Sequence, residues 1–233
     1  MVHHPLAILL TAVAMLLTGL LNAQVNRHQL GAWYMGFWRL GFGEGRWGAQ
    51  GDVQFRNWDA GADLEQLLLR GGVTYSPKNV QATLTLGYAY ILSGAPGEST
   101  ATTNESRVYQ EALLPHHPGW RLFLTHRFRL EERFVQHQDF RTRVRYALFL
   151  NAPLNRPKVG PGAVYLALYD ELFINGERGI GEGRTVSLFD RNRAYGALGY
   201  ALNDHLRLQA GAMLQSTDAW TKPQLQLSLH ARY

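Results

Sequence analysis

Charged and apolar residues alternate along residues 122–134, which read LFLTHRFRLEERF. Arg127, Arg129, Glu131 and Arg133 take every second position, and large apolar residues take most of the positions between them. Because successive residues of a β-strand point to opposite faces, this spacing collects the charges on one face and the apolar groups on the other. A helix would scatter the same residues around its circumference. The stretch therefore predicts a β-strand with one ionic and one apolar face.

The same alternation recurs in the segments 79–93, 139–152, 205–216 and 223–233. In soluble sandwiches strands run for about six residues, with the polar face toward water. Several segments here keep the pattern for about 11 residues or more, the length of a strand that crosses a bilayer at a tilt. In lipid, only a closed barrel pairs every backbone group of such strands. We therefore predict an all-β fold, a single antiparallel transmembrane β-barrel with a polar, arginine-rich lumen.

Eleven alternating segments follow residue 24, separated by turn-forming Gly, Pro, Asn and Asp residues. They cover residues 30–42, 45–58, 64–75, 79–93, 105–114, 119–134, 139–152, 162–175, 187–202, 205–216 and 223–233. Single-chain bacterial barrels have an even number of strands. We therefore expect ten to twelve strands, with ten or twelve favoured over eleven. Either a strand is missed or merged near the ambiguous residues 24–42, or residues 24–30 begin inside the lumen.

The connections predict which strand ends share a side of the barrel. If the last strand ends in the periplasm, the tight joints lie on that side and the longer connections face outward, as in known barrels. The tight joints are 43–45, 76–78, 115–118 and Asn203-Asp204. The longer connections are 93–105, 176–186 and 217–222.

The N-terminus indicates export. Residues 5–21 form an apolar run, and Ala23 precedes a plausible cleavage site before Gln24. We expect a cleavable secretory signal peptide at residues 1–23 and an outer-membrane barrel at 24–233. The alternative to a signal peptide is a membrane-spanning helix, for which the run is near the lower length limit. The alternative to a membrane barrel is a secreted soluble β-barrel or sandwich.

Composition excludes several classes of protein. The chain has no cysteine, which removes disulfides, thiolate metal sites and a lipoprotein anchor. Its formal net charge is +5, but no run of Lys and Arg forms a phosphate-binding patch, so nucleic acid is not an expected partner.

Tyr and Trp near segment ends resemble the girdles of membrane barrels. These residues are Trp33, Trp38, Trp47, Trp58, Trp120, Tyr88, Tyr90, Tyr200, Trp220 and Tyr233.

The inward positions of the predicted strands carry far more arginine than acid. We expect an ionic network in the lumen, made of Arg127, Arg129, Glu131, Arg133, Arg141, Arg143, Arg145, Glu171, Arg191 and Arg193. Arg56, Arg207 and Arg232 also point inward by parity. One interpretation is structural, because paired Arg and Glu side chains would fill a narrow lumen. The other is a narrow pore that prefers small anions, because fixed positive charge lowers the energy of anions in a channel.

An outer-membrane lipid hydrolase is the enzymatic alternative. Such an enzyme needs a Ser and a His within hydrogen-bond reach, with the nucleophile facing lipid. Ser228 and His230 lie two residues apart, but their parity places them in the lumen. His126 points outward without a nearby outward serine. We therefore expect no catalytic residues and a passive role, as a pore, a scaffold or a surface-binding barrel.

Neither a metal nor a cofactor is expected. His116 and His117 are adjacent and would point in opposite directions on a strand, and His126 and His137 lack a carboxylate at ligand spacing. The glycines of residues 176–183 follow no βαβ pattern, so we interpret them as an outer loop and not as a nucleotide-binding loop.

Several motifs resemble an uncharacterised bacterial family catalogued as domain of unknown function 2490. They are Gly87-Tyr88-Ala89-Tyr90, residues 127–134 and 141–146, Glu171-Leu172-Phe173 and residues 189–193. The resemblance extends over about residues 30–233 and implies an outer-membrane-type barrel without a known activity. Tyr233 resembles the terminal aromatic signal read by the barrel-assembly machinery. The partners that we expect are therefore this machinery and outer-membrane lipid.

Overall fold

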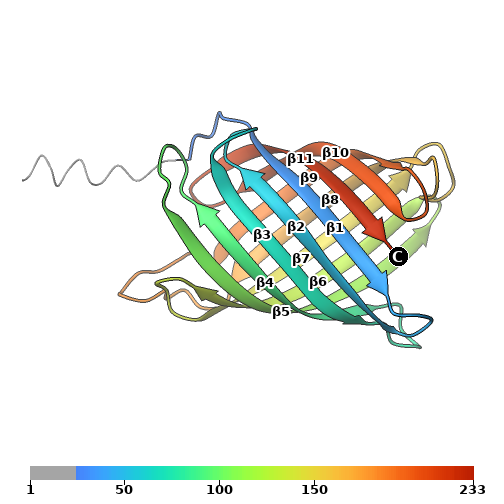
Figure 1. Cartoon of the computed structure of the whole chain (residues 1–233), viewed down its shortest axis with the longest axis horizontal. Coiled ribbons are helices and arrows are strands. Elements are labelled where there is room, and N and C mark those ends of the chain that lie inside the picture. The colour runs from blue at the N-terminus through green and yellow to red at the C-terminus, as the bar shows by residue number, and fades with distance from the viewer. Residues whose placement is uncertain (1–24) are drawn as a thin grey trace, which may run out of the picture.

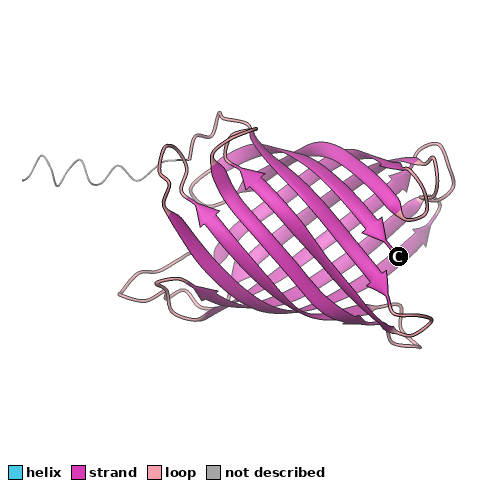
Figure 2. Ribbon diagram, viewed as in Figure 1, coloured by secondary structure: helices cyan, strands magenta, loops and turns pink. Residues whose placement is uncertain are grey.

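The computed structural model describes residues 25–233, so the expected signal peptide lies outside the described residues. These residues form one closed barrel of eleven strands (Figures 1 and 2). The strands are β1 (Gly31–Gly41), β2 (Trp47–Asn57), β3 (Leu64–Tyr75), β4 (Thr83–Gly94), β5 (Thr102–Gly119), β6 (Leu122–Val135), β7 (Arg141–Pro153), β8 (Val164–Asn175), β9 (Phe189–Ala201), β10 (Leu206–Ser216) and β11 (Thr221–Arg232). Within the same residues, no helix has the length and apolar character needed to cross a membrane.

The all-β barrel is confirmed, and its strand number lies within the expected range of ten to twelve. The expectation of an even number is wrong, because β1 and β11 close the barrel as a parallel pair, from Gly31 opposite Gln224 to Arg39 opposite Arg232. Every other pair of neighbouring strands is antiparallel. As a result, the start of β1 and the end of β11 lie at opposite ends of the barrel (Figure 1). We call these ends the N-terminal mouth and the C-terminal mouth.

The expectation of a tight turn at residues 115–118 is wrong. These residues continue β5, whose register against β6 shifts between His116 and Gly119, and only Trp120 and Arg121 form the turn. Proline is tolerated near the end of a strand and at a bulge because its missing N–H breaks no regular ladder there.

The three longer connections share the N-terminal mouth, as predicted. However, residues 154–163 form a connection of similar length at the C-terminal mouth, so the expected short/long alternation is not observed. The side chain of Asn155 orders this connection by donating to the carbonyl of Gly162 (3.0 Å) and accepting from the amide of Val164 (2.8 Å).

The longest connection, residues 176–188, is tied to its neighbours at the N-terminal mouth. The carboxylate of Glu177 accepts hydrogen bonds from the backbone amide and the hydroxyl of Thr142, and these donors lower the pKa of that exposed carboxyl. Arg184 donates to the carbonyl of His137 at 2.7 Å. The glycine-rich loop therefore has defined contacts with β7 and with the turn that precedes it.

The outer face of the barrel is predominantly apolar. Val53, Leu86, Val144, Leu198 and Leu227 point outward and are each at least half exposed. The exposed aromatic residues Trp47, Trp120 and Tyr233 lie at the C-terminal mouth, and Trp58 and Trp220 meet edge to face at the N-terminal mouth.

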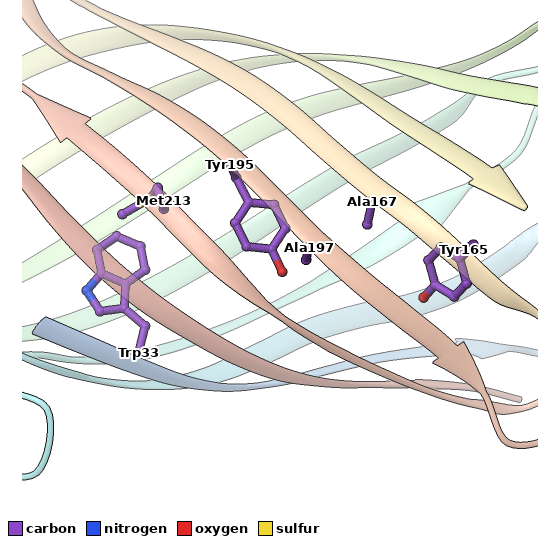
Figure 3. Close-up of a cluster of buried hydrophobic side chains, with 6 residues drawn as sticks. All are labelled: Trp33, Tyr165, Ala167, Tyr195, Ala197 and Met213. Carbon is purple, nitrogen blue, oxygen red and sulfur yellow. The ribbon is translucent and has the colours of Figure 1, made fainter. Parts of the chain in front are cut away.

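Trp33 does not belong to the expected aromatic girdle. Its side chain lies inside the barrel, only 2% exposed, in a cluster with Tyr165, Tyr195 and Met213 (Figure 3). In β1 the residues of both faces are largely apolar, so a tryptophan there fits either side. The partners on β8, β9 and β10 decide the side, because they form an apolar interior surface against which the indole packs.

Candidate functional site

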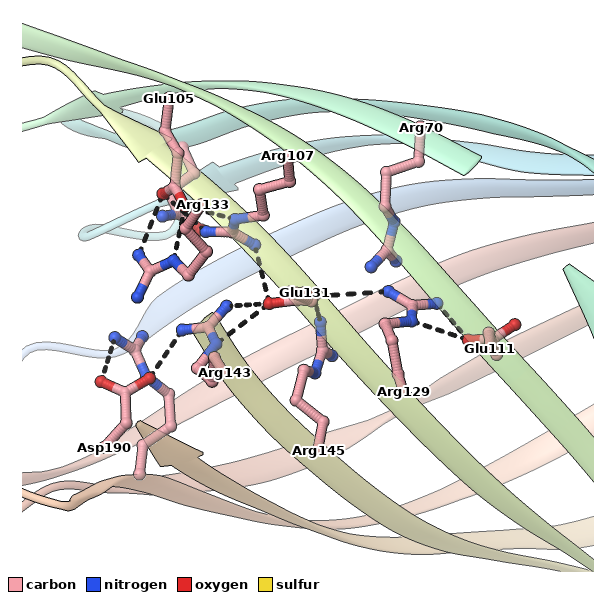
Figure 4. A network of polar contacts seen from close by, with 12 residues as sticks. Arg70, Glu105, Arg107, Glu111, Arg129, Glu131, Arg133, Arg143, Arg145 and Asp190 are labelled. Atoms are coloured by element: carbon pink, nitrogen blue, oxygen red, sulfur yellow. Dashed lines mark hydrogen bonds and ion pairs between the residues drawn. The ribbon is translucent and has the colours of Figure 1, made fainter. Parts of the chain in front are cut away.

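A carboxylate surrounded by four guanidinium groups lies inside the barrel (Figure 4). The Glu131 side chain is 1% exposed, and its oxygens accept hydrogen bonds at 2.5 Å from Arg143 and from Arg145. Arg107 and Arg129 each place a nitrogen 3.7 Å from the same carboxylate. Alternation along β6 turns Glu131 inward, and the facing strands β5 and β7 supply three of the four arginines.

Ion pairs extend from this centre along the inner wall. Glu171 pairs with Arg127 and Arg145, both at 2.5 Å. Glu105 pairs with Arg107 (2.5 Å) and Arg133 (2.6 Å), Glu111 with Arg129, and Asp190 with Arg143 (2.6 Å) and Arg191 (3.2 Å). We call this connected set the ionic network. It comprises Glu105, Arg107, Glu111, Arg127, Arg129, Glu131, Arg133, Arg143, Arg145, Glu171, Asp190 and Arg191.

Eight of the ten residues named from the sequence for this network belong to it. Arg141 and Arg193 are buried inside the barrel, but neither has a carboxylate within 4.0 Å among residues 25–233.

Four members of the network, Glu105, Arg107, Glu111 and Asp190, were not predicted from the sequence. The first three take alternate positions of β5, so parity could have found them. Asp190 and Arg191 are adjacent and still contact each other inside the barrel, where the β8/β9 register shifts between Phe173 and Ile174. This irregularity has no alternating pattern that would reveal it.

The interior carries an excess of positive charge. Among the described residues, eight arginines and Lys222 are buried, against six buried carboxylates. Lys222 donates to the backbone carbonyls of Asn26 (3.0 Å) and Gln29, and Arg27 donates to the carbonyl of Ala219 (2.7 Å). The segment before β1 is thus held against the β10–β11 connection at the N-terminal mouth.

A cavity of about 410 Å³ lies between the ionic network and the C-terminal mouth. We call it the chamber. Arg127, Arg145 and Glu171 belong to both the network and the chamber, and the exposed residues His205 and Arg232 mark its outer end. Seven arginines line it, namely Arg56, Arg70, Arg127, Arg145, Arg193, Arg207 and Arg232, and Glu171 is the one acidic residue among its described lining residues. Its aromatic lining residues are Trp33, Phe37, Phe149, Tyr165, Tyr169 and Tyr195.

A close approach of ring and backbone shapes one wall of the chamber. Tyr165 of β8 lies opposite Gly199 of β9, and a Cβ atom at Gly199 would collide with the tyrosine ring. The ring therefore lies flat against the inner wall, where its hydroxyl accepts a hydrogen bond from Gln209 (3.1 Å).

Ser228 and His230 also line the chamber. The Ser228 hydroxyl and Nε2 of His230 share a hydrogen bond of 2.9 Å, and the imidazole stacks on Phe37. In the described part of the chain, no carboxylate is hydrogen-bonded to this histidine. His126 is on the outer face, where it shares a hydrogen bond of 2.9 Å with the hydroxyl of Tyr146. The two histidines are thus on different faces of the wall, and neither forms a Ser–His–acid arrangement with another residue of the described range 25–233.

No group of three or more potential metal ligands assembles within residues 25–233. His116 stacks on His126 with ring centroids 6.0 Å apart, and His117 stacks on Phe123. The adjacent histidines therefore point to different partners.

Tyr233 extends the seam between β1 and β11. Its amide donates to the carbonyl of Arg39 (2.9 Å), and its own carbonyl accepts from the amide of Gly41 (2.8 Å). The ring is exposed and stacks on His205 with centroids 5.3 Å apart.

A family model described as "Protein of unknown function (DUF2490)" matches residues 30–226, which confirms the resemblance found in the sequence. Neither a curated protein nor a solved structure matches the chain. The family description prints no activity, so function has to come from the geometry of the network and the chamber.

Proposed function

We propose that this chain, which belongs to the DUF2490 family, is an outer-membrane β-barrel that is closed to ions and holds a ligand in its chamber. The outer face supports the membrane location. Its outward side chains are predominantly apolar, in strands of 11 to 18 residues, and lipid is the solvent in which such a face carries no hydration cost. A soluble barrel or sandwich would present the polar face to water.

The observation that supports a closed lumen is the burial of the ionic network. The side chain of Glu131 is 1% exposed and that of Arg143 is 3% exposed, although both point into the barrel interior. A continuous water-filled path at this level would leave these groups accessible to water. The arginine excess therefore serves packing and binding in this proposal, and the anion-preferring pore is set aside.

We expect the purified barrel to be silent in a planar bilayer. The experiment measures current steps after insertion of detergent-folded protein, with an open porin in the same bilayer as the positive control. Steady steps with an anion-favouring reversal potential would show that the arginines line an open path and would overturn the proposal of a closed barrel.

The parallel closure predicts that the two ends of the mature barrel chain face opposite sides of the membrane. The chain has no cysteine, so single-cysteine variants can be labelled without background. Asp218→Cys and His28→Cys place a thiol at the N-terminal mouth, and Asp204→Cys places one at the C-terminal mouth. With the C-terminal mouth in the periplasm, a membrane-impermeant maleimide labels the first two in intact cells, and labels Asp204→Cys only after the outer membrane is permeabilised.

The unmodified chain is the control for this labelling. Labelling of all three variants in intact cells, without permeabilisation, would contradict a membrane-spanning barrel. Labelling of Asp204→Cys together with His28→Cys, but not Asp218→Cys, would contradict the parallel closure.

A further inference from the structure

Arg193 is a buried cation that has no carboxylate within 4.0 Å among residues 25–233. Its side chain lies on β9, 5% exposed as a residue, and its Nε donates to the side-chain oxygen of Gln215 at 2.7 Å. Among the described residues, its two terminal nitrogens have no hydrogen-bond acceptor. Glu171 is directly across from Arg193 in the β8/β9 register, but its carboxylate pairs through Oε1 with Arg127 and Arg145 and is not within 4.0 Å of Arg193.

A second guanidinium lies at the same place. Arg56 and Arg193 both approach the ring of Trp33, at 3.9 Å and 4.7 Å from its centroid, and Arg56 is hydrogen-bonded to two neutral glutamines. Glu65 accepts a hydrogen bond from the indole nitrogen (2.8 Å), yet within residues 25–233 it is not within 4.0 Å of either guanidinium. Two cations therefore share one aromatic ring without a paired carboxylate.

Buried cations are expensive unless an anion compensates them. The cost of removing an ion from water persists even after relaxation, and cation–π contacts return only part of it. Elsewhere in this barrel, arginines such as Arg143 and Arg145 are compensated by carboxylates at 2.5 Å. Arg56 and Arg193 differ because they line the chamber, where space for an anion exists.

We infer that the chamber binds an amphiphilic organic anion, with its anionic group between Arg193 and Arg56 and its apolar body along the aromatic wall. This inference rests on the proposed function of the chamber as a ligand site and names the chemical class of the ligand. The volume of about 410 Å³ lies at the lower end of the range for small-molecule pockets. The ligand is therefore small, about the size of a phenyl ring carrying a short acid chain.

The lining supports each part of such a ligand. Phe149, Tyr165 and Tyr169 present apolar ring surface to the chamber. The charge of the lining disfavours an apolar cation as the ligand, because seven arginines and one acid line the chamber. Arg207 and Arg232 lie toward the C-terminal mouth, where their positive charge attracts anions from solution and raises the rate of entry. A hydrophilic anion such as inorganic phosphate would satisfy the guanidinium groups but leave the aromatic wall without a partner.

The test is calorimetric titration of the full barrel, in lipid nanodiscs, with 4-phenylbutyrate as the probe. The neutral amide of 4-phenylbutyrate tests the apolar body without the charge, and inorganic phosphate tests an anionic group without the apolar body. We expect 4-phenylbutyrate to bind more tightly than either. Arg193→Gln should weaken that binding by about 10-fold to 100-fold, the loss expected for hydrogen bonds to a charged group. Arg178→Gln, in the connection at the N-terminal mouth, is the matched control and should leave binding unchanged.

Thermal unfolding separates a binding role from a structural one. Arg193→Gln removes an uncompensated charge, so the unfolding midpoint of the ligand-free barrel should stay the same or rise, and Arg193→Lys should recover part of the binding. A fall in the midpoint comparable to that of an ionic-network variant would show that Arg193 is structural and overturn the inference. Equal affinity for the neutral amide, or equal affinity of Arg193→Gln for the probe, would overturn it as well.

The inference and the proposed function can fail separately. Bilayer currents measured without probe test whether the barrel is closed, while the titration tests the ligand class regardless of conductance. A barrel that conducts steadily and still loses 4-phenylbutyrate binding on Arg193→Gln would keep the anion site and reject the closed lumen.

Discussion

Replacing Glu131 by glutamine lowers the free energy of unfolding of the barrel by about 3–5 kcal/mol, the cost expected when a buried ion pair loses one partner. The substitution keeps the size of the side chain and removes its charge, so four guanidinium groups around one carboxylate lose their common anion. Urea unfolding of the barrel in lipid vesicles, followed by tryptophan fluorescence, measures the change.

Glu132→Gln is the matched control, because the next residue of β6 points to the outer face. Its carboxylate accepts a hydrogen bond from Gln110 (3.3 Å) and has no arginine within 4.0 Å among residues 25–233. We expect the free energy of unfolding of this variant to match that of the unmodified protein. A small, equal effect of both substitutions would mean that water reaches the ionic network and solvates its charged groups.

For the proposed membrane barrel, replacing Leu227 by arginine on the outer face should cost about 2–4 kcal/mol of stability, the value for a cation near the midplane. Leu227 lies near the middle of β11, and its side chain is half exposed. The expected result is loss of the folded band that resists cold detergent on a gel, and loss of stable insertion into vesicles.

Gln209→Arg is the control for the lumen side. Gln209 is opposite Ser228 in the β10/β11 register, one residue from Leu227, and it faces the chamber. There the new side chain enters a cavity of about 410 Å³ and not lipid, so insertion should be preserved. Equal loss with both substitutions would contradict the assignment of faces, and release of the unmodified protein by carbonate without detergent would favour a secreted soluble barrel.

Local alternation explains why the barrel and the faces of its strands could be predicted. Glu131 and the arginines around it are fixed by parity, since a strand with one buried face has one register that keeps its apolar residues outside. Parity also applies to Glu105, Arg107 and Glu111, but their importance depends on the register between β5 and β6, which only the pairing of whole strands determines.

Features that depend on closure of the whole sheet could not be predicted. The odd number of strands follows from the pairing of Gly31 with Gln224, and neither residue carries a local sign of it. The chamber likewise arises from several strands together, because it is bounded by the ionic network on one side and by the flat ring of Tyr165 on another. Arg193 was expected in the network for its inward parity, and its lack of a carboxylate depends on which neighbours already hold Glu171.

The parallel seam between β1 and β11 also has a consequence for folding kinetics. Ten of the eleven strand pairs join neighbours in sequence, so they form from hairpins of low contact order. The seam alone joins opposite ends of the barrel chain, and its loop-closure entropy has to be overcome in a single late step. Until that step, the edges of β1 and β11 remain unpaired and open to association with other chains. The backbone hydrogen bonds of Tyr233 with β1 therefore stabilise the junction that we expect to close last.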